Sequence, residues 1–155
     1  MQHKIRLVFL TLFYSGLSPK APGTIGSILA LILGMLALEV LHISNIFMIV
    51  ILVTIIGIQQ INLYEQDIGV HDGKEIVIDE FVGMWLALSI AGVQAGMWIM
   101  GIIAFIYFRI FDIWKPSLIG KIDRDVKGGL GVMGDDLLAG FFAGICTSMT
   151  YYLLF

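Results

Sequence analysis

Five apolar segments, each close to the length of a membrane-spanning helix, dominate this sequence. A helix needs about 20 mostly apolar residues to cross the hydrocarbon layer of a bilayer. The alternating pattern typical of barrel strands does not accompany the segments, and helices satisfy their backbone hydrogen bonds internally. The sequence therefore predicts an all-α, polytopic membrane helical bundle with about four or five spanning helices. The segments comprise residues 25–43, 46–63, 76–92, 97–114 and 137–155.

The overall composition supports the same fold class. Of the 155 residues, 59% are hydrophobic and 14% are charged, which is far more apolar than an average soluble domain. Residues 7–17 predict a further, short helix at the membrane interface, before the first long segment. Since the segments and their connections use nearly the whole chain, we expect a single membrane-embedded domain over residues 1–155.

The charged residues are concentrated on one side of the predicted bundle. The turns 42–45 and 91–96 are uncharged and belong on one side, whereas the N-terminus and the connections 59–74 and 114–134 fall on the other. That second side receives all nine lysine and arginine residues and eleven of the twelve acidic residues, leaving Glu39 alone. By the positive-inside tendency it is cytoplasmic. We expect a multi-pass protein of the cytoplasmic membrane, with its motif loops in the cytoplasm.

The motif GLSPKAPGTIGS, residues 16–27, comes just before the first long apolar segment. Its prolines and glycines predict a shaped turn, and Thr24 or Ser27 is placed to cap the helix that follows. A helix start with free backbone amides, hydroxyl groups and the nearby Lys20 is suited to binding a phosphate or a lipid headgroup. A structural turn at the membrane surface explains the same residues equally well.

The motif EIVIDEFVGMW, residues 75–85, places Asp79 and Glu80 inside an apolar run. Carboxylates in such a position usually face the interior of a helical bundle and serve a site, because unpaired burial of a charge is unfavourable. Gly83 follows Asp79 by one helical turn, so a neighbouring backbone or a ligand can approach there. The alternative is that the two acids only mark the aqueous end of a span.

The motif FRIFDIWKP, residues 108–116, carries Arg109, Asp112 and Lys115 at spacings of three. One helical face therefore presents a cation, an anion and a second cation before Pro116 ends the helix. An intrahelical ion pair explains this pattern in part. At the mouth of a membrane bundle, two cations beside a carboxylate also suit a site for an anionic substrate and a metal ion.

The motif KIDRDVKGGLGVMGDDLLAG, residues 121–140, places Asp135 and Asp136 side by side at the expected start of the last helix. The helix dipole explains one acid there. Two adjacent acids repel unless one is protonated or a cation lies between them, and Mg²⁺ binds carboxylates together with phosphate oxygens. The small residues Ala139 and Gly140 permit close helix packing next to the acids.

Taken in order, the blocks SPKAPGTIGS, EIVIDEFVGMW, FRIFDIWKP with IDRDVKGG, and GVMGDDLLAG resemble the signature of the phosphatidylglycerophosphatase A family over nearly the whole chain. The resemblance implies hydrolysis of phosphatidylglycerophosphate to phosphatidylglycerol and inorganic phosphate in phospholipid biosynthesis. It also implies Mg²⁺ as the cofactor and a phospholipid in the bacterial inner membrane as the substrate.

The residues and the resemblance together give a hypothesis for the site. The expected catalytic residues are Asp79, Glu80, Asp112, Asp135 and Asp136. All of these except Asp112, which is a further candidate, are expected to bind one or two Mg²⁺ ions that activate water. An aspartyl-phosphate intermediate is the mechanistic alternative. The expected substrate-binding residues are Lys20, Thr24, Ser27, Arg109, Lys115, Arg124 and Lys127.

Other functions remain open at this stage. Intramembrane acids also occur in small transporters or ion pathways, but the far half of the predicted spans offers few polar groups. A CDP-alcohol phosphotransferase is a second alternative, although its DG-AR aspartate pattern is missing. The match of DRDV, residues 123–126, to haloacid-dehalogenase-type phosphatases lacks the required strand and is interpreted as chance. The net charge of -3 argues against nucleic-acid binding, and no obligate protein partner is indicated beyond bilayer lipid.

Overall fold

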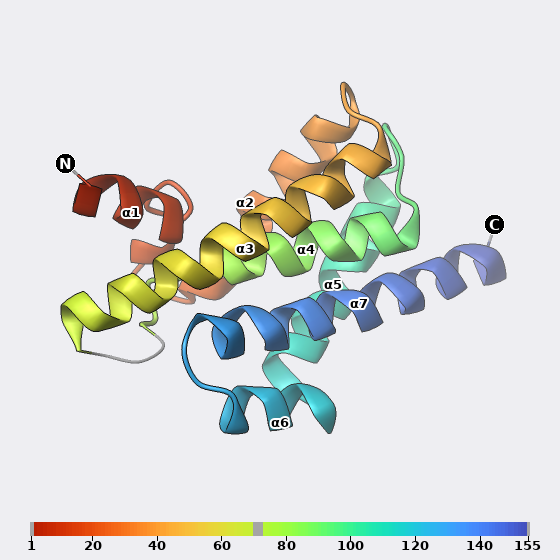
Figure 1. The fold of residues 1–155 in the computed structure, drawn as a ribbon. Helices are drawn as coiled ribbons and strands as arrows, with labels where there is room; N and C mark the ends of the chain where they lie inside the picture. Colours follow the sequence, from red (N-terminus) through yellow and green to blue (C-terminus); the bar gives the residue numbers. More distant parts are fainter. Residues whose placement is uncertain (1, 70–72, 155) are drawn as a thin grey trace.

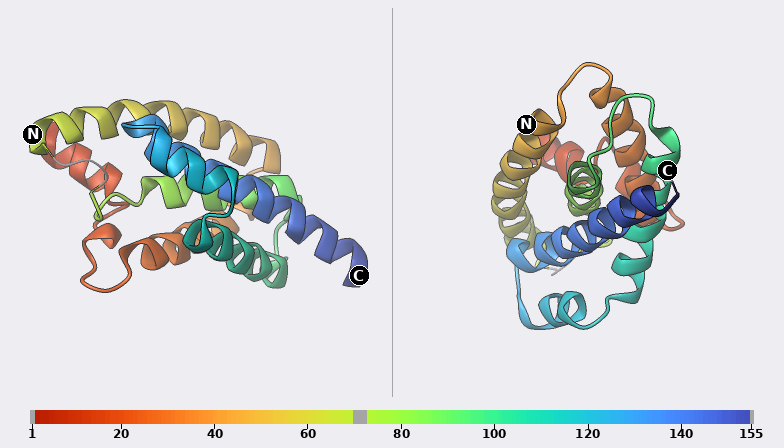
Figure 2. Two further views of the ribbon diagram at one scale, coloured as in Figure 1. Left: turned by 90° about the horizontal axis from the view of Figure 1, so that it is seen from below. Right: turned by 90° about the vertical axis from the view of Figure 1, so that its right-hand side faces the viewer.

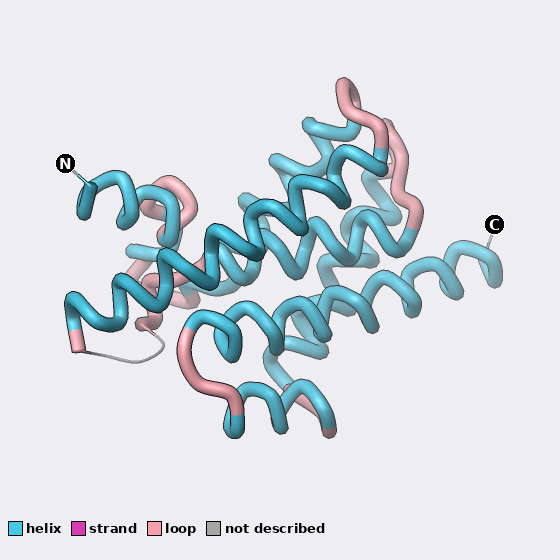
Figure 3. The backbone as a smooth tube through the Cα atoms, viewed as in Figure 1, coloured by secondary structure: helices cyan, strands magenta, loops and turns pink. Residues whose placement is uncertain are grey.

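The fold is known from a computed structural model that describes residues 2–69 and 73–154. These residues form α-helices and one 3-10 turn, with no strand among them (Figures 1 and 3). The predicted all-α class is confirmed for this part of the chain, whereas residues 70–72 of the predicted connection and Phe155 of the last segment lie outside it. The elements are α1 (Gln2–Leu10), η1 (Ser15–Leu17), α2 (Pro22–Leu38), α3 (Ile43–Ile68), α4 (Ile78–Ala91), α5 (Trp98–Trp114), α6 (Leu118–Asp125) and α7 (Gly129–Leu154).

Helix α4 lies at the centre of the bundle. It packs against α2, α3, α5 and α7, and Figure 2 shows it encircled by the other helices. None of its residues is exposed. The indole N–H of Trp85 donates a hydrogen bond of 2.9 Å to the carbonyl of Ala30 and so ties α4 to α2. Beyond Asp79 and Glu80 in its first turn, the helix is almost entirely apolar, which is typical of a buried helix.

Two glycines bring α4 and α7 into close contact. A side chain at Gly140 would overlap the carbonyl oxygen of Gly83. A Cβ atom at Gly83 would lie 2.7 Å from the carbonyl oxygen of Asp136. Glycine at both positions therefore allows the two backbones to touch, as the small residues beside the acids predicted. This contact places the acids of α7 next to those of α4.

The outer helices carry large apolar side chains on their exposed faces. Examples are Leu52 and Ile55 on α3, Ile106 on α5, and Met149 on α7. By length and composition, α3 and α7 are each apolar enough to cross a membrane, and α2 is apolar but shorter. These features indicate that the chain associates with a membrane. The expectation of four or five spans stays a prediction.

Two connections meet at the end of the bundle that also carries the C-terminus (Figure 1). The first runs over residues 39–42, and the second over residues 92–97. Glu39 accepts a hydrogen bond of 3.1 Å from the backbone N–H of Gly96, which joins the two connections. Their predicted common side is consistent with this contact. The first connection begins earlier than predicted, because α2 ends at Leu38, and it therefore contains Glu39, the acid expected on this side.

The predicted connection 59–74 is helical over its first ten residues, because α3 continues to Ile68. Two of its polar side chains form hydrogen bonds with other elements. Gln60 accepts a hydrogen bond of 3.2 Å from Arg6 on α1. Asn62 accepts one of 2.7 Å from the backbone N–H of Gly129 at the start of α7. These tertiary hydrogen bonds allow polar residues to continue the helix.

Two other segments also differ from their predicted bounds. The connection 114–134 contains α6 and the first turns of α7, which begins at Gly129. Gly129 packs so closely on the backbone of Ile58 that a side chain would not fit, so the glycines serve packing rather than a loop. The N-terminal helix spans Gln2–Leu10 instead of residues 7–17, and it cannot continue because Leu12, Phe13 and Tyr14 adopt positive φ angles.

Candidate active site

A polar cavity of about 260 Å³ lies where the N-terminus of α4 meets the end of α5 and the first turns of α7. The loop before α4, the start of α2 and helix α6 complete its walls. All five residues predicted to be catalytic line this one cavity, although they come from three helices. They are Asp79, Glu80, Asp112, Asp135 and Asp136.

Three carboxylates in this cavity form a tight cluster. One oxygen each from Glu80, Asp112 and Asp136 lies within 4.8 Å of the others. The Oδ2 atom of Asp136 is buried and has no hydrogen-bond partner among the described residues. An orphaned buried oxygen is unfavourable, and carboxylate oxygens are ligands that divalent cations prefer. The cluster therefore fits a divalent metal ion.

Arg109 of α5 balances part of this negative charge. Its Nη1 atom lies 2.6 Å from Glu80 and 2.7 Å from Asp112. The hydroxyl of Ser27 lies 2.6 Å from the same oxygen of Glu80, and Thr24 accepts a longer bond of 3.4 Å from Arg109. The intrahelical pair predicted for Arg109 and Asp112 is present, yet Arg109 also bridges to α4. Asp136 receives no such ion pair within the described chain.

Lys115 lines the same cavity and pairs with two of its carboxylates. It follows the last residue of α5 in a left-handed conformation, with φ of 43°. Its ammonium group lies 2.7 Å from Asp135 and also contacts Asp123 of α6. Partial burial alone would lower the pKa of Lys115, but the two carboxylates outweigh this effect and raise the pKa above its ordinary value. Lys115 therefore remains a cation at neutral pH.

Comparison of the sequence with known proteins identifies the family of this chain. A sequence profile of the family described as phosphatidylglycerophosphatase A matches residues 8–151. The chain belongs to the phosphatidylglycerophosphatase A family. The predicted resemblance is thereby confirmed, and with it the assignment as a phosphatase enzyme.

Individual relatives agree with the family assignment. Phosphatidylglycerophosphatase A of Escherichia coli K12 is 42% identical over 134 residues, covering 86% of this chain and 76% of the relative. The Haemophilus influenzae protein of the same name is 38% identical over 143 residues, covering 92% and 86%. A Bacteroides thetaiotaomicron protein, named as a proposed phosphatidylinositol-3-phosphatase, is 38% identical over 147 residues, covering 92% and 91%. No solved structure gives a significant match.

The two adjacent acids of α7 have different partners in this member of the phosphatidylglycerophosphatase A family. Asp135 faces Lys115, whereas Asp136 faces the carboxylate cluster. The interpretation of one acid as a helix cap was wrong, because α7 begins six residues before Asp135, at Gly129, and has no acid in its first turn. The dipole at the helix start therefore does not explain either acid.

The first motif, residues 16–27, contributes to the acidic cavity by packing against it. The expectation that Thr24 or Ser27 caps α2 was wrong, because the N-cap residue is Ala21 and no side chain caps the helix. Instead, Ser27 reaches Glu80 from inside α2. A side chain at Gly23 would collide with a carboxylate oxygen of Glu80. Glycine at position 23 therefore allows the start of α2 to pack directly against Glu80.

Sequence reasoning missed two charged residues that line the cavity, Lys74 and Asp123. Asp123 belongs to the DRDV segment, which was interpreted as a chance match. Because Pro116 lies between Lys115 and Asp123, their spacing could not place the two residues on one face of a helix. The structure does not bring every predicted substrate-binding residue to the cavity wall. Lys20, Arg124 and Lys127 are exposed and do not line it.

Proposed function

We propose that this chain is a Mg²⁺-dependent phosphatase that hydrolyses phosphatidylglycerophosphate to phosphatidylglycerol and inorganic phosphate. The names of the Escherichia coli and Haemophilus influenzae relatives support this substrate. We further propose that the cavity opens at the cytoplasmic face of the bacterial inner membrane. The gathering of all nine lysine and arginine residues in the segments at that end supports this orientation.

The cluster of Glu80, Asp112 and Asp136 carries the proposal. Arg109 compensates the first two acids, at 2.6 Å and 2.7 Å, but leaves a buried oxygen of Asp136 without a partner. A cation at that oxygen would relieve both the repulsion among the acids and the unfavourable burial. We therefore assign these three residues as Mg²⁺ ligands. Asp135 lies on the same wall of the cavity and is the candidate for a second ion.

The remaining residues of the cavity have separate roles in this proposal. When bound, Mg²⁺ neutralises phosphate charge and makes water a better nucleophile. Lys115, a cation on the cavity wall, binds the terminal phosphate, and Lys74 assists it. Asp79 forms no ion pair with any described residue, so its carboxylate is available to accept the proton of the attacking water. The same carboxylate is the candidate nucleophile if an aspartyl-phosphate forms.

The exposed cations attract the substrate to the cavity rather than bind it there. Lys20, Arg124 and Lys127 lie outside the cavity wall and are exposed. Basic residues near a membrane surface favour anionic headgroups by about 1 kcal/mol each. We propose that these three residues concentrate the dianionic headgroup at the cavity mouth. Thr24 and Ser27 act indirectly, because they contact Arg109 and so position Glu80.

We also propose that α2, α3, α5 and α7 cross the membrane around α4. The exposed apolar faces of these outer helices support a multi-pass arrangement. Helix α4 has 14 residues, which corresponds to a length of about 21 Å and falls short of a full span. Its acids would then lie within the bundle near one surface, rather than along a path across the bilayer. This distribution favours an enzyme over the transporter alternative.

One assay tests the proposal. The purified chain is incubated with phosphatidylglycerophosphate, phosphatidic acid and a phosphatidylinositol phosphate, each with Mg²⁺ or with a chelator, and released phosphate is measured. We expect rapid release from phosphatidylglycerophosphate that stops with the chelator. Release from the inositol lipid alone would favour the activity named for the Bacteroides relative. No release from any of the lipids would overturn the proposal and favour the transporter or phosphotransferase alternatives.

A further inference from the structure

Two apolar grooves lie on either side of helix α1. The first, of about 480 Å³, is enclosed by α1, α2, α3 and α4. The second, of about 550 Å³, lies between α1 and α3. Ile5 and Phe9 line both grooves, so these two side chains of α1 form a shared wall. The arrangement offers two neighbouring, mostly apolar grooves that share the side chains of Ile5 and Phe9.

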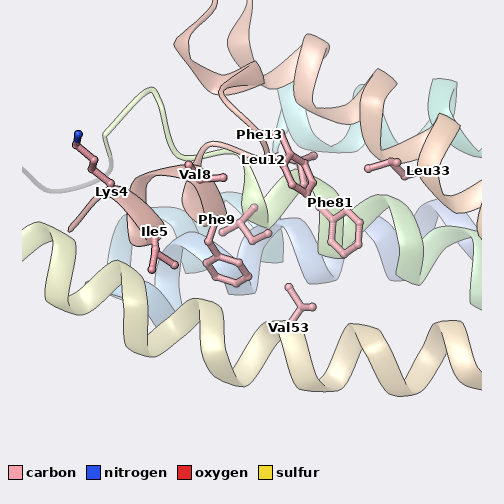
Figure 4. Close-up of a pocket in the computed structure, with 10 residues that line it drawn as sticks. Lys4, Ile5, Val8, Phe9, Leu12, Phe13, Leu33, Val53 and Phe81 are labelled. Atoms are coloured by element: carbon pink, nitrogen blue, oxygen red, sulfur yellow. The ribbon is translucent and has the colours of Figure 1, made fainter. Parts of the chain in front are cut away.

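The first groove is apolar along its whole length except at one end. Figure 4 shows Phe9, Val53 and Phe81 around it, with the side chain of Lys4 directed away from them. Lysine side chains at a membrane surface extend their ammonium group toward water and headgroups in this way. Lys4 is exposed and forms no ion pair with any residue that the structure describes. It is therefore available to an anionic ligand.

The second groove is also lined by a cationic side chain, but that side chain is already paired within the protein. Arg6 lines this groove together with Gln60, and the two side chains form a hydrogen bond of 3.2 Å. Arg6 additionally forms an ion pair with Asp67. Among the described residues of α1, Lys4 is therefore the one cation beside the two grooves that has no ion-pair partner.

Both grooves are separate from the candidate active site. Ile78 and Phe81 of α4 face the first groove, whereas Asp79 and Glu80 of the same helix line the acidic cavity. The body of α4 lies between them. A ligand in the grooves therefore cannot place its phosphate at the carboxylate cluster.

We propose that the grooves bind one accessory phospholipid with two acyl chains and an anionic headgroup. Its acyl chains lie on either side of the wall formed by Ile5 and Phe9, and the net negative charge of its headgroup is balanced by Lys4. The paired grooves match the two tails of a phospholipid, and Lys4, which has no ion pair among the described residues, matches an anionic headgroup. This site is distinct from the substrate site and does not depend on the proposed reaction.

Native mass spectrometry of the purified full chain tests the site. The probes are phosphatidylserine and phosphatidylcholine with identical palmitoyl and oleoyl chains, because neither is a phosphomonoester substrate. We expect one tightly retained lipid per chain, with phosphatidylserine favoured about fivefold through one cation. Val53→Phe, which fills the first groove, should reduce retention at least about tenfold. Leu52→Phe, on the exposed face of α3, is the matched control and should retain the lipid.

A second pair of variants tests the headgroup contact without altering the grooves. Lys4→Gln should remove the preference for phosphatidylserine while leaving phosphatidylcholine retention unchanged. Lys121→Gln, an exposed residue of α6, should keep the preference. If Val53→Phe does not yield folded protein by size-exclusion chromatography, the Lys4 pair decides. Several loosely held lipids without headgroup preference, unaffected by Lys4→Gln, would mean only non-specific bilayer contact and would overturn the proposal.

Discussion

The two faces of helix α4 differ completely, although their residues are neighbours in the sequence. Asp79 and Glu80 line a cavity whose walls are mostly charged. Ile78 and Phe81 line a groove that is apolar apart from Lys4. The difference arises because acids and a cation come to one face with α5, α6 and α7, whereas α1, α2 and α3 bring apolar side chains to the other, with Lys4 as the one charged residue among those that line it. The surrounding helices, rather than the sequence of α4 alone, decide what each face can bind.

The sharpest test of the polar face is Asp136→Asn. Loss of the uncompensated carboxylate should lower phosphate release about a thousandfold and raise the Mg²⁺ concentration needed for half-maximal activity. Isothermal titration with Mg²⁺ and an activity assay measure the two effects. Asp125→Asn, an exposed residue at the end of α6, is the matched control. Full activity with an unchanged Mg²⁺ requirement in Asp136→Asn would contradict the assigned role.

Asp79→Asn separates metal binding from proton transfer on the same face. Because Asp79 lies outside the tight cluster, we expect kcat to fall about a hundredfold with little change in Mg²⁺ affinity. A rapid-quench experiment that traps a phosphoprotein in the wild type, but not in Asp79→Asn, would identify this residue as the nucleophile. Unaltered turnover of Asp79→Asn would exclude both roles.

Gly140→Val tests whether close packing keeps the polar face together. The valine side chain cannot fit against the carbonyl of Gly83, so α4 and α7 must move apart. We expect a loss of about 1–3 kcal/mol in the free energy of unfolding, measured by thermal unfolding in detergent, with a weaker response to Mg²⁺. Ile145→Val, on the exposed face of α7, should change neither quantity. A stable, fully active Gly140→Val protein would show that the helix contact does not position the acids.

Much of the polar face could be predicted from local sequence. Asp79 and Glu80 stand out because acids are rare in apolar helices, and the pair Asp135 and Asp136 stands out for the same reason. The close approach at Gly140 was also predictable, since small residues beside acids permit helix contact. Each of these signals lies within one turn of a single helix.

The rest depends on contacts between segments that are far apart in the sequence. The polar run that includes Gln60 and Asn62 predicted a connection, yet both side chains find partners on other elements and α3 continues. The start of α7 was missed because Gly129 is unfavourable in a helix and is used for packing on Ile58. Asp123 reaches the cavity only because α6 folds back beneath it, which no local spacing reveals.

The enclosure of α4 has a consequence for how the enzyme responds to its membrane. If the outer helices cross the membrane as proposed, acyl chains of the bilayer contact mainly these helices, since none of the residues of α4 is exposed. A thinner or thicker bilayer acts on the outer helices through tilt and mismatch. The direct packing of α4 against α5 and α7 keeps Glu80 beside Asp112 and Asp136 when those helices tilt, so we expect the proposed active-site geometry to depend little on lipid chain length.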